Sequence, residues 1–128
     1  MNKFGTYQVS QKPYDFFGCT KNGLYWCAEA KKVILERFPI RNIADHQRVS
    51  LSKVSDNNGL AFLFINWRYK RSGETIWITF NEYCDIEYDI ISKDRKSITP
   101  NDFDENWFLT RQPSNWIVPT NHYLYNLI

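Results

Sequence analysis

Apolar residues along this chain gather in short runs separated by turn-forming residues, which is the pattern of β-strands. The run LAFLFINW at residues 60–67 is apolar nearly throughout, as expected for a strand that is covered on both faces. The other runs that fit strands are bounded by Gly, Pro, Asn or Asp and lie at residues 5–10, 14–20, 24–34 and 74–80. The pattern predicts a sheet with at least one strand buried on both sides.

One segment, residues 42–56, has the spacing of an amphipathic helix instead. Asn42 is a suitable N-cap, and Asp45 would lie near the positive end of the helix. The apolar positions that recur at helical spacing are Ile43, Leu51 and Val54. We therefore expect one face of this helix to pack on the sheet.

Two further helices are expected in the second half of the chain. Residues 81–91 have a helical pattern, and Thr99 followed by Pro100 is a typical helix start for residues 99–107. The resulting order of elements is β-β-β-α-β-β followed by helices. It predicts a mixed β-sheet flanked by helices, in an α/β or α+β fold.

Length and composition favour one folded domain spanning residues 1–128. Of these residues, 43% are hydrophobic and 17% are aromatic, which places the chain among globular proteins. There is no apolar run of about 18 residues and no signal-peptide pattern, so we expect a cytoplasmic protein without a membrane partner. The three cysteines form no Cys-x-x-Cys pair, which argues against a disulfide framework or a zinc site.

The net charge is only +2, but it is unevenly distributed. Residues 1–56 contain nine Lys or Arg and five acidic residues, whereas residues 57–128 contain seven and nine. A basic half suits a polyanionic partner, although ordinary solvated charge explains the same imbalance. The basic residues that are candidates for nucleic-acid phosphate contacts are Lys32, Arg37, Arg41, Arg48 and Lys53.

The sequence YDFFGCTKNGLYWCAEAKK predicts a β-hairpin that carries an unusual set of charged side chains. Strand periodicity puts Glu29 and Lys31 on the same face of its second strand. If KNG forms a three-residue loop, with Gly23 in the left-handed conformation, Asp15 lies opposite Glu29. A two-residue loop would instead place Asp15 opposite Ala30.

Two carboxylates that face each other across a hairpin repel, so something must compensate their charge. A cationic side chain, protonation of one acid or a divalent metal ion would each do so. Asp followed by Glu-x-Lys on the next strand suits metal-dependent phosphodiester hydrolysis, because carboxylate oxygens bind hard cations and a lysine stabilises developing charge. The backbone carbonyl of Ala30 could add a metal ligand. A structural ion pair between Glu29 and Lys31 fits the pattern equally well.

The sequence around these residues resembles the RecU family of Holliday junction resolvases, members of the PD-(D/E)xK nuclease superfamily. The similar segments are the hairpin, then RFPIRNIADHQ, NGLAFLFINW and KDRKSITPNDFDEN, and more loosely IVPTNHYLYNLI. The resemblance implies a restriction-endonuclease-like core. It also implies a Mg2+-dependent endodeoxyribonuclease, with Mn2+ as a substitute, that acts as a homodimer on four-way junctions or other branched DNA in recombination and repair.

Carried over to this chain, the resemblance implies Asp15 and Glu29 as metal ligands, Lys31 as the catalytic lysine and Gln47 as the glutamine of the helix motif. Gln47 also lies on the apolar stripe of the helix at 42–56, where an amide needs a polar partner. An active-site water, the scissile phosphate or Lys31 would serve. The alternative is a glutamine at the edge of the stripe that reaches solvent.

The sequence departs from the family in one respect. The family carries, before the hairpin, a helix with another acidic residue and a protruding stalk, whereas no Asp or Glu precedes Asp15 here. Another acid, such as Asp45, or a partner chain could complete the metal site in a compact phage or mobile-element form. The second hypothesis is a catalytically silent nuclease-fold module that binds DNA or a partner protein.

Overall fold

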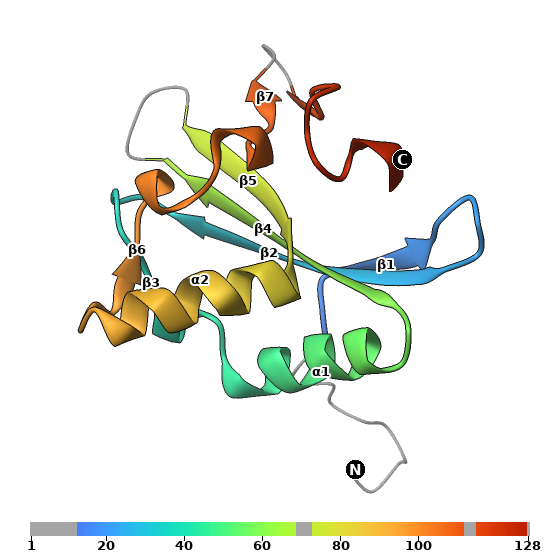
Figure 1. Cartoon of the computed structure of the whole chain (residues 1–128), viewed down its shortest axis with the longest axis horizontal. Helices are drawn as coiled ribbons and strands as arrows, with labels where there is room; N and C mark the ends of the chain where they lie inside the picture. Colours follow the sequence, from blue (N-terminus) through green and yellow to red (C-terminus); the bar gives the residue numbers. More distant parts are fainter. Residues whose placement is uncertain (1–12, 69–72, 112–114, 128) are drawn as a thin grey trace, which may run out of the picture.

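The structure, a computed structural model, describes residues 13–68, 73–111 and 115–127. Its centre is a four-stranded sheet with the strand order β1-β2-β4-β5 (Figure 1). The β1–β2 and β4–β5 pairs are antiparallel, whereas β2 and β4 are parallel, so the sheet is mixed as predicted. These strands are β1 (Phe16–Cys19), β2 (Tyr25–Val33), β4 (Leu60–Trp67) and β5 (Glu74–Thr79). The strand expected at 5–10 lies outside the described residues.

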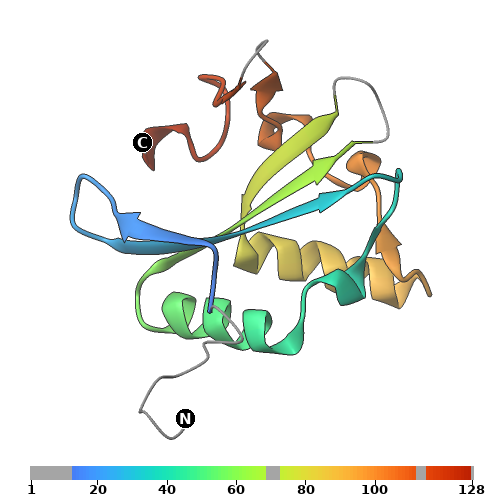
Figure 2. The same ribbon diagram turned by 180° about the vertical axis from the view of Figure 1, so that it is seen from behind.

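Both α-helices, α1 (Asp45–Asp56) and α2 (Phe80–Ser92), pack on one face of the sheet (Figures 1 and 2). The larger core cluster lies between them and the sheet. Its fully buried side chains include those of Leu51, Leu63, Ile65, Trp67 and Tyr83. Neither helix has the length and apolar character needed to cross a membrane, as far as the described residues go.

The opposite face of the sheet is covered in part by the chain's last described segment, residues 115–127, without an α-helix (Figure 1). A second cluster of buried residues forms here from Ala28, Phe62, Trp77 and Leu124. The run at 60–67 is therefore covered on both faces, as its apolar sequence predicts. The mixed sheet flanked by helices, an α/β arrangement, is confirmed, with both α-helices on the same side.

The helix expected at 42–56 begins later than its sequence suggests. Ile40–Asn42 form a short 3-10 helix, and Ile43 is extended with φ −92° and ψ 106°, so Asn42 is not the N-cap of α1. The N-cap is Ala44, whose N–H donates to the side-chain Oε1 of Gln47 at 2.9 Å. A glutamine at the third helical position thus satisfies a backbone group that the alanine side chain cannot.

The third expected helix, at 99–107, forms only two 3-10 helices, Pro100–Asp102 and Glu105–Trp107. Thr99 and Pro100 occupy the predicted N-cap and first helical positions. The helix ends early because Phe103 is extended, with φ −116° and ψ 151°, and is buried in the core. The remaining short elements are β3 (Phe38–Pro39), which pairs with β6 (Ser97–Ile98), β7 (Thr110–Arg111), which pairs with β8 (Trp116–Ile117), and the 3-10 helix Tyr125–Leu127.

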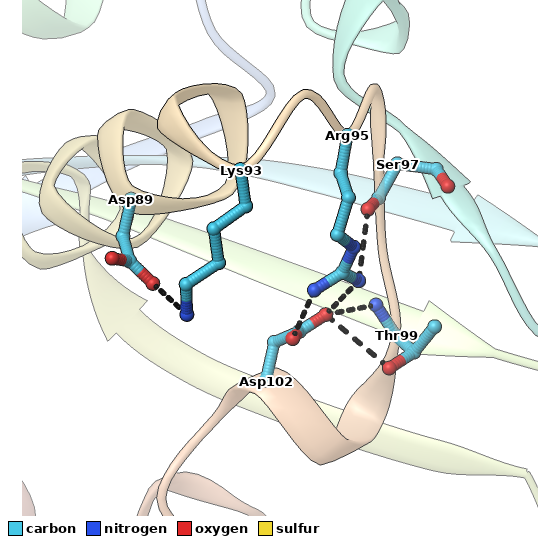
Figure 3. Close-up of polar contacts among 6 residues, drawn as sticks. All are labelled: Asp89, Lys93, Arg95, Ser97, Thr99 and Asp102. Carbon is cyan, nitrogen blue, oxygen red and sulfur yellow. Dashed lines mark hydrogen bonds and ion pairs between the residues drawn. The ribbon is translucent and has the colours of Figure 1, made fainter.

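A polar cluster holds this region onto the end of α2 (Figure 3). Asp102 accepts two hydrogen bonds of 2.8 Å from the guanidinium of Arg95 and one of 2.8 Å from the N–H of Thr99. The guanidinium also donates to the carbonyl of Ser97 at 3.3 Å. The cluster joins the end of α2, β6 and the following 3-10 helix through side chains that are close in sequence.

Candidate active site

The hairpin of β1 and β2 has the register expected of a three-residue loop. Phe16 pairs with Ala28, and the Thr20 N–H donates to the Leu24 carbonyl at 2.8 Å, which leaves residues 21–23 as the loop. Gly23 has a φ of 83°, the left-handed conformation that this loop requires. The three-residue alternative is therefore confirmed and the two-residue loop is excluded.

Asp15 lies just beyond the last pair of the β1–β2 ladder, alongside Glu29. Its N–H donates to the carbonyl of Ala28 at 3.1 Å, and its carboxylate oxygen Oδ2 accepts from the N–H of Ala30 at 2.9 Å. In a strand, the N–H and C=O of one residue point to the same edge. The Ala30 carbonyl therefore faces the edge of β2 where Asp15 lies.

Glu29 is the buried acid at the centre of the site, with 4% of its surface exposed. Its Oε2 accepts a hydrogen bond of 2.8 Å from Nε2 of Gln47 and lies 3.5 Å from Nζ of Lys31. Burial raises the pKa of Glu29 above its ordinary value of 4.5, and the adjacent charge of Asp15 raises it further, whereas Lys31 opposes the shift. The site therefore carries negative charge that one lysine does not fully compensate.

Gln47 connects this carboxylate to the start of α1. Its Nε2 donates to Glu29 while its Oε1 accepts from Ala44, so both ends of the amide are held. The polar partner expected for the Gln47 amide is thus Glu29, and not Lys31 or bulk solvent. The first turn of α1 and the middle of β2 are locked together at this point.

The ligands that these residues offer fit a divalent cation. Two carboxylates and the Ala30 carbonyl are hard oxygen ligands, and Mg2+ commonly takes one or two protein carboxylates and completes its shell with water and substrate phosphates. The raised pKa of Glu29 marks a carboxylate that a cation would stabilise. No group of three or more His, Cys, Asp or Glu side chains is placed to hold a metal within residues 13–68, 73–111 and 115–127. Asp45 lies instead beside Arg48 and Glu87, at a polar pocket between α1 and α2.

Arg48 has a different role from the phosphate contact that its sequence position suggested. Its guanidinium pairs with both carboxylate oxygens of Glu87 at 2.8 Å and donates to the carbonyls of Ile40 and Ile43 at 3.0 Å. These bonds join α1 to α2 and to the preceding 3-10 helix, so the Arg48 guanidinium has partners within the chain. Glu87 is about forty positions away in sequence, and spacing alone gives no sign of the pair.

The other four basic candidates are distributed over the surface. Lys32 is exposed, but strand alternation puts it on the sheet face opposite Glu29, away from the site that it was expected to flank. Arg37 and Arg41 are exposed in the connection between β2 and α1, and Lys53 is exposed in the last turn of α1. The structure thus brings together Asp15, Glu29, Ala30, Lys31 and Gln47, and it separates Lys32 and Arg48 from them.

Comparison with known proteins identifies the family of the chain. The model of the family described as RecU, Recombination protein U, matches residues 5–125. The Holliday junction resolvase RecU of Listeria welshimeri is 33% identical to the chain over 86 residues, which are 66% of this chain and 41% of that relative. The chain therefore spans well under two thirds of the relative's length. Because the family match extends over nearly the whole sequence, this protein belongs to the RecU family.

Proposed function

We propose that the protein is a metal-dependent endodeoxyribonuclease that cuts branched DNA, in the manner of a Holliday junction resolvase. The observation that carries this proposal is the arrangement at Glu29, where a second carboxylate, a lysine and an amide converge on one buried acid. The relative from Listeria welshimeri bears the name of such a resolvase. A structural ion pair would not require Asp15 beside an acid that is already buried.

Asp15 and Glu29 would hold the cation through carboxylate oxygens, with the Ala30 carbonyl as a third protein ligand. Mg2+, or Mn2+ in its place, supplies positive charge that stabilises both acids and the scissile phosphate. The Asp15 carboxylate is already oriented by the N–H of Ala30. The hairpin thus presents its ligands in a fixed arrangement before DNA arrives.

Lys31 is suited to act on the attacking water or the phosphate. Its ammonium group carries three hydrogens and is only partly exposed, with 19% of the side-chain surface accessible. One hydrogen faces Oε2 of Glu29, and the others are available to orient water or to neutralise a phosphate oxygen in the transition state. Gln47 keeps the Glu29 carboxylate in place because its own amide is fixed at both ends.

The substrate and assembly extend this proposal. Two strands of a four-way junction are cut symmetrically only if two related sites act together, so we propose a homodimer. Exposed Arg37, Arg41 and Lys53 would contact phosphates without reading the base sequence. Binding should therefore weaken as salt concentration rises.

The test is cleavage of labelled four-way junction, linear duplex and single-stranded DNA in Mg2+ or Mn2+, with Lys31→Ala as the variant. We expect metal-dependent cutting that prefers the junction and is lost in the variant. Lys32→Ala is the matched control, because Lys32 is the next residue along β2 but lies on the other face. Junction binding without any cutting by the unmodified protein would instead support the catalytically silent module.

A further inference from the structure

Three aromatic side chains form a cluster along one face of the β1–β2 hairpin. The ring centroids of Tyr14, Phe17 and Tyr25 lie 6.2–6.4 Å from one another, and the rings of Phe17 and Tyr25 are stacked at 28°. The hydroxyl groups of Tyr14 and Tyr25 are hydrogen-bonded to each other. We call these three residues the hairpin shelf.

Two residues of the hairpin shelf, Phe17 and Tyr25, are open to solvent, whereas Tyr14 is half-buried and packs against the larger core cluster. Phe17 is 69% exposed and Tyr25 is 38% exposed. β2 pairs with β4 only from Trp26 onward, so the hairpin end projects beyond the neighbouring strand (Figures 1 and 2). One side of the Phe17 ring packs on Tyr25, while most of the ring surface remains accessible. Exposing an apolar ring to water is unfavourable in free energy.

The hairpin shelf lies on the same face of the sheet as the acidic site. Tyr25 and Glu29 are four residues apart on β2, so both point to one face, roughly 13 Å from each other at the usual rise of a strand. Phe17 pairs with Cys27 and therefore shares that face. Tyr14 directly precedes Asp15. Phe17 lies opposite Cys27, two residues along the ladder from the position of Asp15 and Glu29, which is roughly 7 Å or about two steps of a DNA strand at 3.4 Å per nucleotide.

The charge around the hairpin shelf suits a nucleic acid. Lys21 is the only charged residue from 16 to 28, so no carboxylate on this part of the hairpin repels a phosphate. The hydrogen bond between the Tyr25 and Tyr14 hydroxyl groups raises the pKa of Tyr25 to about 12, so the Tyr25 phenol adds no negative charge. A protein surface that combines exposed rings with positive charge is the type that binds unpaired strands.

We propose that the hairpin shelf stacks an unpaired nucleobase of branched DNA, with Phe17 as the contact residue, and so places the adjoining strand over the site at Glu29. This inference rests on the proposed nuclease function and adds a determinant of substrate shape. Bases in an intact duplex are stacked on one another and present no free ring face. An exposed ring therefore favours a strand that is open at a branch point.

The experiment is binding of a four-way junction that carries 2-aminopurine at the branch point, compared with an intact duplex of the same sequence. It is done in Ca2+ to prevent cleavage, with Phe17→Ala, Phe17→Leu and Phe17→Tyr. Stacking on an aromatic ring should quench the 2-aminopurine fluorescence. We expect Phe17→Ala and Phe17→Leu to lose the quenching and to bind the junction about tenfold more weakly. Phe17→Tyr should retain both properties, and duplex affinity should not change.

Three results would overturn the inference. Equal losses on junction and duplex would mean a general contact, and wild-type behaviour of Phe17→Leu would mean that any apolar side chain suffices. Dissociation of a dimer by Phe17→Ala in analytical ultracentrifugation would assign the hairpin shelf to a second copy of the chain. Because Phe17 is so exposed, its truncation should leave folding intact, which a thermal unfolding scan verifies.

The same measurements separate this inference from the proposed function. If the unmodified protein quenches the 2-aminopurine fluorescence but does not cut the junction in Mg2+, the role of the hairpin shelf would stand and the proposed nuclease activity would be rejected. Junction cleavage by a protein whose binding and fluorescence do not depend on Phe17 would do the reverse. Failure to bind DNA of any shape would overturn both.

Discussion

Glu29 and Asp102 are both carboxylates in polar clusters at the margin of the core, yet their surroundings stabilise the two charges to different degrees. Asp102 accepts bonds of 2.8 Å from both terminal nitrogens of Arg95 and from the Thr99 N–H (Figure 3). These partners, Arg95 first, hold the pKa of Asp102 below its ordinary value of 3.8. Burial and Asp15 hold the pKa of Glu29 above 4.5.

This difference separates a cluster that stabilises the fold from one that is suited to bind and react. Around Asp102 the charges are paired and the hydrogen bonds are complete within the chain. Around Glu29, Asp15 adds a second negative charge, while the ammonium of Lys31 lies 3.5 Å from the Glu29 carboxylate, so one lysine faces two acids. Perturbed pKa values that arise from burial and like charge are typical of functional sites.

The largest effect should come from Glu29→Gln. Loss of a metal ligand should lower the cleavage rate roughly 100-fold or more, as measured by junction cutting in Mg2+. The metal-free protein should be at least as stable as before, because the variant removes a buried charge beside Asp15. A large loss of stability in EDTA would show that Glu29 is a structural acid like Asp102.

The pH dependence of the stability of the metal-free protein also distinguishes Glu29 from Asp102. A folded pKa above 4.5 means that the native state binds the Glu29 proton more tightly than the unfolded state does. Stability in EDTA should therefore fall as pH rises through the raised pKa, and Mg2+ should restore it. Urea unfolding of Glu29→Gln should lack this contribution.

Asp102→Asn should have its effect on stability instead of chemistry. Removing the carboxylate leaves Arg95 without its partner, and we expect the free energy of unfolding at pH 7 to fall by roughly 1–3 kcal/mol. Because the folded pKa is lowered, this contribution is present above pH 3.8 and is lost as pH falls through the folded pKa. Cleavage well below the melting temperature should be retained.

A matched control for this variant lies in the same region (Figure 3). Asp89 and Lys93 form an ion pair of 3.0 Å with side chains that are 58% and 62% exposed. Asp89→Asn should change the free energy of unfolding by less than about 0.5 kcal/mol, because exposed pairs contribute little. Equal costs for Asp89→Asn and Asp102→Asn would contradict the distinction between them.

Gln47→Met tests whether the Gln47 amide lowers the pKa of Glu29 or only packs beside it. The variant keeps the size of the side chain but loses the donor to Glu29 and the acceptor for Ala44. The pKa of Glu29 should rise further, so cleavage at the acidic end of the pH–rate profile should fall roughly tenfold. An unchanged pH–rate profile together with lower stability would mean that Gln47 acts only as a cap of helix α1.

A separate effect of pH on stability is expected at His122, which belongs to neither acidic cluster. Its Nδ1 accepts from the Leu124 N–H at 3.0 Å, its Nε2 lies 3.0 Å from the Trp107 carbonyl, and burial lowers its pKa below 6.5. Stability should be complete above pH 6.5 and decrease as pH falls toward the lowered pKa, by at most about 1.4 kcal/mol per pH unit. Thermal unfolding of His122→Phe, which keeps an aromatic ring against Trp77, should show no such dependence.

Local rules predicted much of the site. The KNG loop and Gly23 settle the hairpin register, and alternation along β2 places Glu29 and Lys31 on one face. The same alternation also puts Lys32 on the opposite face. Grouping the basic residues by their position in the sequence did not take this into account. For the hairpin, the sequence reduced the register to two alternatives, and the structure selected the three-residue loop.

Prediction failed where specific side-chain contacts, and not propensity, decide the local structure. Helix α1 begins at Asp45 because Gln47 caps Ala44 and because Arg48 binds the carbonyls of Ile40 and Ile43. The helix expected at 99–107 breaks because Phe103 is drawn into the core beside Trp67. Helix propensity gives no indication of these contacts.

By itself, the sequence predicted the mixed sheet, two alternative hairpin registers and the face that Glu29 and Lys31 share, because each depends on short-range periodicity and turn geometry. Only the tertiary structure decided how the charges are balanced. Burial, the approach of α1 to β2 and the Arg48–Glu87 pair each require segments far apart in the chain to meet. The electrostatic character of Glu29 is therefore a property of the packed molecule, although its position is a property of the sequence.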